Sequence, residues 1–248
     1  MFIPAWFLGN EISHQCAELL LAAIIGVLLY YIPLCIAKRQ GNIKSMMLIE
    51  PVAKAIAAGV VSFSCWAMLK PHLLTNVQGF LVSPDMLYFL GGVAAGGGLV
   101  LRTHHYFGDT SSNAATAAML AHGAAEGAGL GLLVGTPAFP AVFRSQVLHG
   151  VPDGMLVATA SLQRSGLLRT LLAAAVARAG QAGAFYAIAK CAPVVSDEAV
   201  WTGEGVAFGS MAVMAWQELA QPAKERLGKA RSAAIATTAA VVTSFAFC

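Results

Sequence analysis

Charged residues are scarce in this chain. They account for 11% of its 248 residues, whereas hydrophobic residues account for 58%, and the mean hydropathy is +0.70. Soluble domains carry roughly 25% charged residues. The scarcity therefore argues against a soluble protein and favours a polytopic membrane protein.

Cysteines are few and isolated. The five of them occur singly, without the CxxC spacing of a thiolate zinc site or the clustered pattern of a disulfide framework. They are Cys16, Cys35, Cys65, Cys191 and Cys248. Neither kind of cysteine-based site is indicated, and the redox compartment stays open.

Several motifs are also missing. The chain has no GxxxxGK[ST] phosphate loop, no HExxH zinc-protease motif and no GxSxG nucleophile turn. The opening MFIPAWFLGN lacks the basic n-region and cleavage site of a signal peptide. We therefore expect no ATP-driven pump, no enzyme and no cleaved leader, and we expect no nucleic-acid partner.

What the sequence does contain is a series of long apolar runs. Segments of about 17 to 25 apolar residues can cross a bilayer as helices, and eight can be placed. They cover residues 12–36, 51–69, 84–102, 113–134, 140–161, 167–190, 198–217 and 230–247. The connections are short, so we expect an all-α bundle of eight transmembrane helices forming a single domain, 1–248, in contact with membrane lipid.

The basic residues are distributed unevenly among the connections, and such asymmetry sets membrane orientation. Most of them belong to connections 1–2, 3–4, 5–6 and 7–8, whereas the other three connections hold only Lys70, Arg144 and Lys190. The pattern predicts that the richer connections face the cytoplasm and that both termini face outward. The chain would then be a multi-pass protein of a plasma or inner membrane.

Small residues recur along the fourth expected helix. Gly123, Gly127, Gly131 and Gly135 occupy every fourth position and therefore one face. Small residues let membrane helices approach closely, so this stripe is read as a packing seam rather than an ion path. His122 and Glu126 border the stripe and should face protein.

Two stretches place ionisable pairs inside apolar helices. LAHGAAEGAG holds His122 and Glu126, and LHGVPDGM holds His149 and Asp153, with the same four-residue spacing. Residues four apart lie on one helix face. Each histidine lies about nine residues into its helix, roughly 14 Å, so the two pairs should meet near the membrane midplane.

Two imidazoles and two carboxylates form a donor set for Zn²⁺, Fe²⁺, Mn²⁺ or Co²⁺, and cadmium would accept the same ligands. Burying charge in a membrane costs roughly 2.5 to 3.5 kcal/mol per residue on insertion scales, so a functional role is expected. The alternative is a structural polar cluster in which Asp153 or Glu126 pairs with Arg178. That alternative leaves the other groups unexplained.

The motifs HGAAEG and HGVPDG resemble the HNxPEG-type motifs of the ZIP (Zrt/Irt-like) divalent metal transporters. The likeness extends to eight expected spans with outward termini and to His104 and His105 between the third and fourth spans. It also includes QAGAFYAI, similar to the family's EPLGALLG, and WQELAQPAKE, similar to HELLPEA. The resemblance implies import of a divalent metal as substrate, most simply zinc.

The chain departs from the family pattern at specific positions. Gly123 and Gly150 stand where the family has polar residues, and Gln181 stands near the family's glutamate in the sixth helix. The resemblance therefore implies His122, Glu126, His149 and Asp153 as metal ligands, with Gln181 as a neutral fifth. Arg178, one turn from Gln181, would supply charge where a second metal sits in family members.

One further function remains open at this stage. A sensor or scaffold with a transporter fold would bind metal without moving it. The smaller number of metal ligands here than in the family pattern suggests this function. An intramembrane metalloenzyme is disfavoured because each histidine lies on a different helix and is followed by glycine. The sequence leaves the oligomeric state open, with a homodimer as one option.

Overall fold

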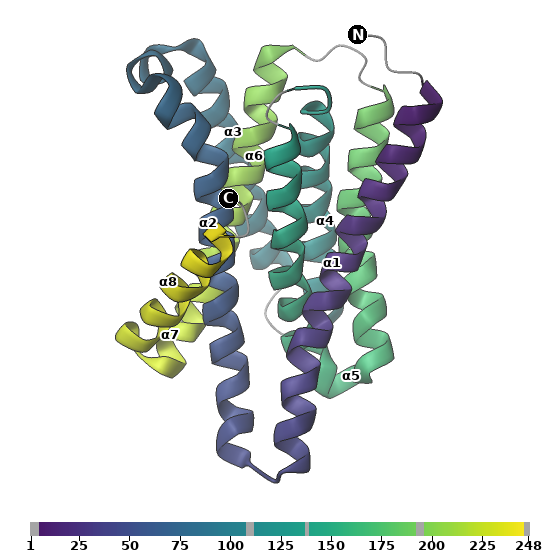
Figure 1. The fold of residues 1–248 in the computed structure, drawn as a ribbon, viewed down its shortest axis with the longest axis vertical. Helices are drawn as coiled ribbons and strands as arrows, with labels where there is room; N and C mark the ends of the chain where they lie inside the picture. Colours follow the sequence, from purple (N-terminus) through teal and green to yellow (C-terminus); the bar gives the residue numbers. More distant parts are fainter. Residues whose placement is uncertain (1–4, 108–111, 137–138, 192–195, 246–248) are drawn as a thin grey trace.

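The computed structural model describes residues 5–107, 112–136, 139–191 and 196–245. Within these ranges the regular structure is helical and no strand occurs. The expected all-α fold is confirmed. In chain order the helices are α1 (Ala5–Arg39), α2 (Ile43–Val82), α3 (Pro84–Phe107), α4 (Ser112–Leu132), α5 (Phe139–Cys191), α6 (Asp197–Met214), the π-helix η1 (Ala215–Ala220), α7 (Gln221–Leu227) and α8 (Lys229–Phe245) (Figure 1).

The segment α5 contains two of the expected helices. They join at Gly166, whose φ of 75° and ψ of 171° break the helix and reverse the chain. Glycine suits this position because a positive φ carries no Cβ clash. The helix continues through Pro152 without another non-helical residue. The two halves, 139–165 and 167–191, correspond to the expected spans 140–161 and 167–190.

Four helical stretches are long and apolar enough to cross a membrane by length and composition. Among the described residues they are Glu11–Arg39, Ile43–Lys70, Pro84–Arg102 and Arg164–Lys190. The other expected spans fall on α4, the first half of α5, α6 with η1, and α8. Helix α4 carries His122 and Glu126, and the first half of α5 carries His149 and Asp153.

Helix ends differ from the expected boundaries in two places that affect the site motifs. The third helix continues to Phe107, so His104 and His105 lie on its last turns instead of in a loop; their side chains are outside the described residues. The fourth helix ends at Leu132, and Gly135 takes a positive φ of 87° in the turn that follows. The glycine stripe is therefore helical only as far as Gly131.

The bundle is built on close contacts between helix backbones. On α1, Gly26 faces the carbonyl oxygen of Val151, and Gly154 of α5 faces that of Ala23. On α3, Gly96 faces the carbonyl oxygen of Val206 in α6. A Cβ at any of these three glycines would collide with backbone atoms. The small residues therefore set how closely α1 packs on α5 and α3 on α6, as expected for membrane helices.

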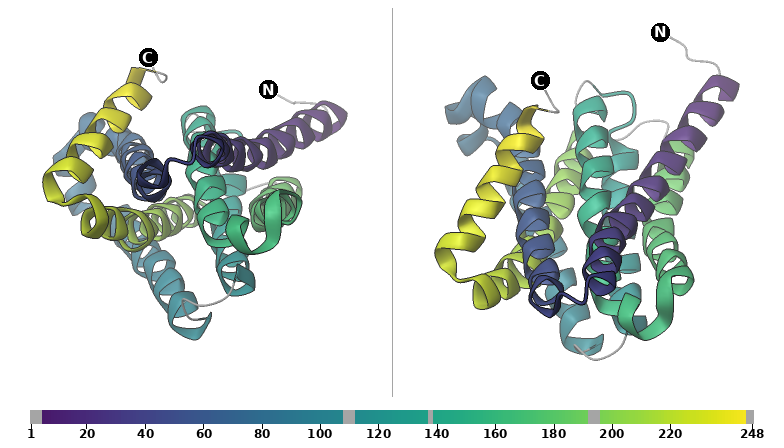
Figure 2. Two further views of the ribbon diagram at one scale, coloured as in Figure 1. Left: turned by 90° about the horizontal axis from the view of Figure 1, so that it is seen from below. Right: turned by 60° about the horizontal axis from the view of Figure 1, so that its bottom comes forward.

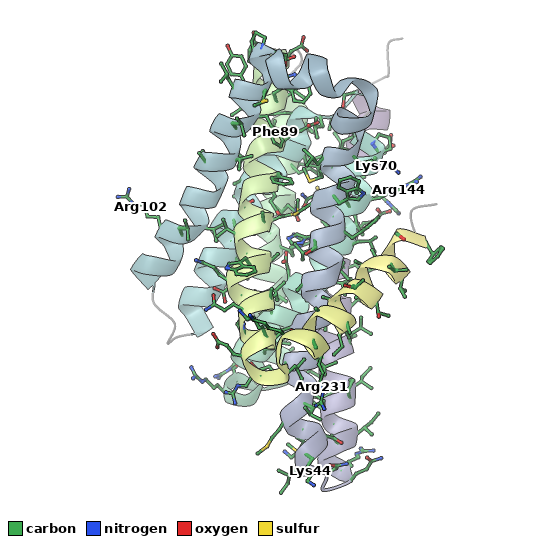
Figure 3. The ribbon with its side chains drawn as sticks, turned by 90° about the vertical axis from the view of Figure 1, so that its left-hand side faces the viewer. Lys44, Lys70, Phe89, Arg102, Arg144 and Arg231 are labelled. Carbon is green, nitrogen blue, oxygen red and sulfur yellow. The ribbon has the colours of Figure 1, made fainter. Side chains whose placement is uncertain are left out.

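The site helices lie inside this arrangement. Helix α4 contacts α5 and α6, α1 packs along α5, and α2 packs against both α5 and α8. The hairpin between α1 and α2 projects beyond the rest of the bundle (Figure 1). Figure 2 shows α7 and α8 at the periphery beside α2. Lys44 and Arg231 lie toward the same end as that hairpin, whereas Lys70 and Arg144 lie farther up (Figure 3).

We predict that Gly96→Ala destabilises the bundle and that Gly98→Ala, two residues along the same helix, does not. A Cβ at Gly96 meets backbone of α6, whereas a Cβ at Gly98 meets nothing within 4 Å. Overpacking costs about 1–3 kcal/mol, while alanine is favoured over glycine in a helix by about 1 kcal/mol. Thermal unfolding in detergent measures the stability of both variants. Equal unfolding midpoints for Gly96→Ala and Gly98→Ala would contradict the packing account.

Candidate metal centre

Four ionisable side chains from two neighbouring helical segments meet inside the bundle. His122 and Glu126 come from α4, and His149 and Asp153 come from the first half of α5. All four are buried, with at most 3% of each residue exposed. The imidazole rings of His122 and His149 lie 6.1 Å apart between centroids in an edge-on arrangement. The structure thus brings together the two pairs that the sequence places at matching depth.

Glu126 lies between the two histidines. Its Oε1 is 3.3 Å from Nε2 of His122 and 3.5 Å from Nε2 of His149. One ligand atom from each of these three residues lies within 4.8 Å of the other two. Two imidazoles and one carboxylate at such separations form a donor set that suits zinc and its neighbours among the divalent transition metals.

Asp153 lies at the edge of this triad. Its Oδ1 is 3.4 Å from Nε2 of His149, and its Oδ2 is 3.0 Å from Nη1 of Arg178. The side chain therefore contacts an imidazole with one oxygen and a guanidinium with the other.

Arg178 is buried and contacts both carboxylates. Its Nη1 lies 3.6 Å from Oε2 of Glu126 as well as beside Asp153. Its Nη2 donates a hydrogen bond of 2.8 Å to the backbone carbonyl of Gln146. Buried charges need partners of opposite sign, and Arg178 provides one to each carboxylate.

Gln181 lies against Glu126 with its amide nitrogen. The Nε2 donates to Oε2 of Glu126 at 3.3 Å and to Oε1 of Gln146 at 2.7 Å. Its Oε1 is buried and has no hydrogen-bond partner among the described residues. The residue expected to offer a neutral oxygen therefore joins the site, and in this arrangement its nitrogen is the atom that contacts the carboxylate.

Sequence reasoning missed Gln146. It is fully buried one turn before His149, accepts hydrogen bonds from both Arg178 and Gln181, and directs its Nε2 to Sδ of Met211 in α6 at 3.9 Å. Its spacing of three residues from His149 places it on the same face of α5. That spacing was the available signal, because a glutamine without charge is otherwise inconspicuous.

The approach of α4 to the second half of α5 brings Arg178 and Gln181 to Glu126. A Cβ at Gly127 would collide with the carbonyl oxygen of Gln181, and one at Gly123 would lie 3.2 Å from that of Ala177. The residues beside Glu126 and His122 must therefore be small for this contact to form. The expected packing role of the stripe is confirmed for these two glycines.

Several polar atoms of the site are buried without a hydrogen bond in the described part of the chain. They include both ring nitrogens of His122, both of His149, and Oε1 of Glu126. Buried polar atoms in proteins nearly always have partners. A dication held between Nε2 of each ring and Oε1 of Glu126 would satisfy three of these atoms at once, so the residues present fit a metal.

Comparison with known proteins does not assign the chain to a family. No protein-family model matches the chain, and no curated protein matches it. Inferences about function therefore rest on the residues and their geometry.

We predict that Gln146→Ala destabilises the protein more than Gln221→Ala. Loss of the Gln146 side chain leaves the buried amide of Gln181 without its 2.7 Å acceptor, and an unsatisfied buried polar group costs about 1–3 kcal/mol. The side chain of Gln221 is exposed and donates to the exposed side chain of Glu225. Thermal unfolding in detergent compares the two; an equal shift would show that Gln146 does not organise the site.

Proposed function

We propose that this chain is a multi-pass membrane protein that moves a divalent transition metal, with zinc the simplest substrate, toward the cytoplasm. The observation that carries the proposal is the buried triad of His122, Glu126 and His149. The ring nitrogens of both histidines and Oε1 of Glu126 are buried without a hydrogen bond among the described residues, and nitrogen and carboxylate oxygen are the donors that such metals prefer. Fe²⁺, Mn²⁺, Co²⁺ and Cd²⁺ are alternative substrates of the same donor set.

The position of the triad supports transport over simple structural binding. Two of the long apolar helical stretches, Glu11–Arg39 and Arg164–Lys190, pack along the helices that carry the site. Ionisable groups in membrane helices commonly mark ion pathways. Metal would exchange its water shell for the two imidazoles and Glu126, with Asp153 as the adjacent carboxylate, and leave on the other side.

The resemblance of HGAAEG and HGVPDG to ZIP motifs supports the same direction of movement. We include in the proposal the eight membrane crossings, the outward termini and membership of that family. A transporter-fold sensor that binds metal without moving it is the competing function, and time-dependent flux separates the two.

We predict that purified protein in liposomes takes up Zn²⁺ over time and that His149→Ala abolishes this uptake. His149 is the imidazole whose Nε2 lies beside both Glu126 and Asp153, so its removal takes away the nitrogen donor at the centre of the proposed ligand set. His14→Ala is the matched control, because His14 is 76% exposed on α1 and pairs with Glu18. Uptake is followed by an encapsulated fluorescent zinc indicator.

Two results of that assay would count against transport. Equal uptake by His149→Ala and wild type would remove the triad from the pathway. Zinc binding by the wild type without time-dependent uptake would favour the sensor.

We also predict that epitope tags at both ends of the chain are accessible to antibody from outside intact cells. A tag inserted after Gly41, in the turn between α1 and α2, should be accessible only after permeabilisation, because that turn is flanked by Lys38, Arg39 and Lys44. If antibody reached the Gly41 tag in intact cells, the proposed orientation would be wrong. If antibody reached the tag at one terminus but not at the other, the chain would cross the membrane an odd number of times.

A further inference from the structure

We infer that the turn between α7 and α8 binds the head group of an anionic membrane lipid whose acyl chains lie along the outer face of α8. The inference goes beyond the proposed transport, because it concerns the periphery of the bundle and none of the residues of the metal centre. It names a class of partner and the surface that holds it.

Basic residues are concentrated where α7 ends and α8 begins. The stretch KERLGKAR, residues 224–231, holds four cations and one carboxylate, a net charge of three positive. We call this stretch the basic turn. The carboxylate of Glu225 accepts a hydrogen bond from Gln221. The four cationic residues are exposed, and no ion pair among the described residues involves them: they are Lys224, Arg226, Lys229 and Arg231.

The fold gathers these cations at one end of the α7–α8 pair. Gly228 ends α7 with a φ of 82°, and α8 begins at the next residue. Lys229 and Arg231 then lie in the first turn of α8, which holds no acidic residue. Cations are unfavourable there because a helix N-terminus is the positive end of the helix dipole. These two residues therefore do not stabilise their own helix, and an anion bound beside them would offset the repulsion.

The outer face of α8 changes from charged to apolar away from the basic turn. Beyond Arg231 the helix contains no charged residue. Val242 and Phe245 are 64% and 75% exposed, and they share a face with Arg231 because 11 and 3 residues separate the three positions. Elsewhere α8 packs on α2, where a Cβ at Gly59 would collide with the carbonyl oxygen of Ala236. The exposed face thus matches the head group and the chains of an anionic lipid.

The basic turn also lies where a membrane surface would meet it. Helices α7 and α8 are at the periphery beside α2 (Figure 2), whose stretch Ile43–Lys70 is long and apolar enough to cross a membrane. Arg231 lies toward the end of the bundle at which the α1–α2 hairpin projects (Figure 3). The proposed orientation makes this the cytoplasmic end. Clusters of about four to eight Lys and Arg beside a membrane helix on that side are typical of anionic-lipid binding.

Charge alone would also suit inorganic phosphate or an acidic polypeptide. Neither of these ligands would cover the exposed side chains of Val242 and Phe245. A lipid with two acyl chains meets both the cations and the apolar face, so the surface fits the lipid best.

The test presents purified protein, in a neutral detergent and without zinc, with equal amounts of phosphatidylglycerol and phosphatidylcholine that carry the same acyl chains. Lipid that stays bound after gel filtration is counted by mass spectrometry. Wild type should retain phosphatidylglycerol in preference to phosphatidylcholine. Neutralising the basic turn should abolish this preference, because each cation near an anionic lipid surface contributes about fivefold to binding. The charge variant carries Lys224→Gln, Arg226→Gln, Lys229→Gln and Arg231→Gln.

A matched control removes the same number of exposed cations elsewhere on the chain and should keep the preference. It carries Lys38→Gln, Arg39→Gln, Lys44→Gln and Arg144→Gln. A wild type without preference for phosphatidylglycerol would overturn the inference. An equal loss in the two variants would also overturn it, because only the net charge of the chain would then matter.

A second pair of variants tests the acyl chains and does not depend on the folding of the charge variant. Val242→Ser should lower the retention of phosphatidylglycerol, whereas Val176→Ser, at a 50% exposed position of α5, should not. Inorganic phosphate in excess should not displace the lipid. Equal retention by the two serine variants, or displacement by phosphate, would overturn the inference in favour of a phosphate site. Binding of polyglutamate to the basic turn without retention of phosphatidylglycerol would overturn it in favour of an acidic polypeptide.

The outcomes also separate this inference from the proposed function. A wild type that prefers phosphatidylglycerol but takes up no zinc supports the lipid site and removes only the proposed transport. Zinc uptake by a wild type without lipid preference does the reverse.

Discussion

The structure of the site depends on one buried interaction, the contact of Arg178 with Glu126 and Asp153. Two carboxylates inside an apolar bundle would repel each other and lose their hydration. The guanidinium compensates both and holds one oxygen of each, which leaves the other oxygens directed at the imidazoles. A structural polar cluster and the proposed metal centre are therefore compatible, because the arginine that pairs with both carboxylates leaves one oxygen of each beside an imidazole.

Backbone packing makes that contact geometrically available. The two halves of α5 are joined at Gly166, and α4 contacts this folded-back segment with Gly127 against the backbone of Gln181. Small residues thus allow three helical segments to lie close enough for side chains of ordinary length to meet. The polar groups of the site are then surrounded by helices, which is the arrangement that keeps ionisable residues tolerable in membrane proteins.

Much of this arrangement could be predicted from the sequence. Long apolar runs located the helices, the repeated four-residue spacing located both ionisable pairs, and the distance of each histidine from the start of its helix gave their common depth. Spacing placed Gln146 on the face of His149 but not its contacts, and the contact of Arg178 with both carboxylates was not predicted, because both depend on how the second half of α5 returns against the first. The number of helices that cross the membrane is likewise not fixed by hydropathy, since by length and composition four helical stretches among the described residues qualify, whereas the sequence predicts eight spans.

The most direct test of the account is anomalous scattering at the zinc edge from crystals of the protein grown with Zn²⁺. The account predicts one strong peak within bonding distance of Nε2 of His122, Nε2 of His149 and a carboxylate oxygen of Glu126. A peak bound only by surface residues, with these three side chains still in contact with one another and no ion between them, would contradict it.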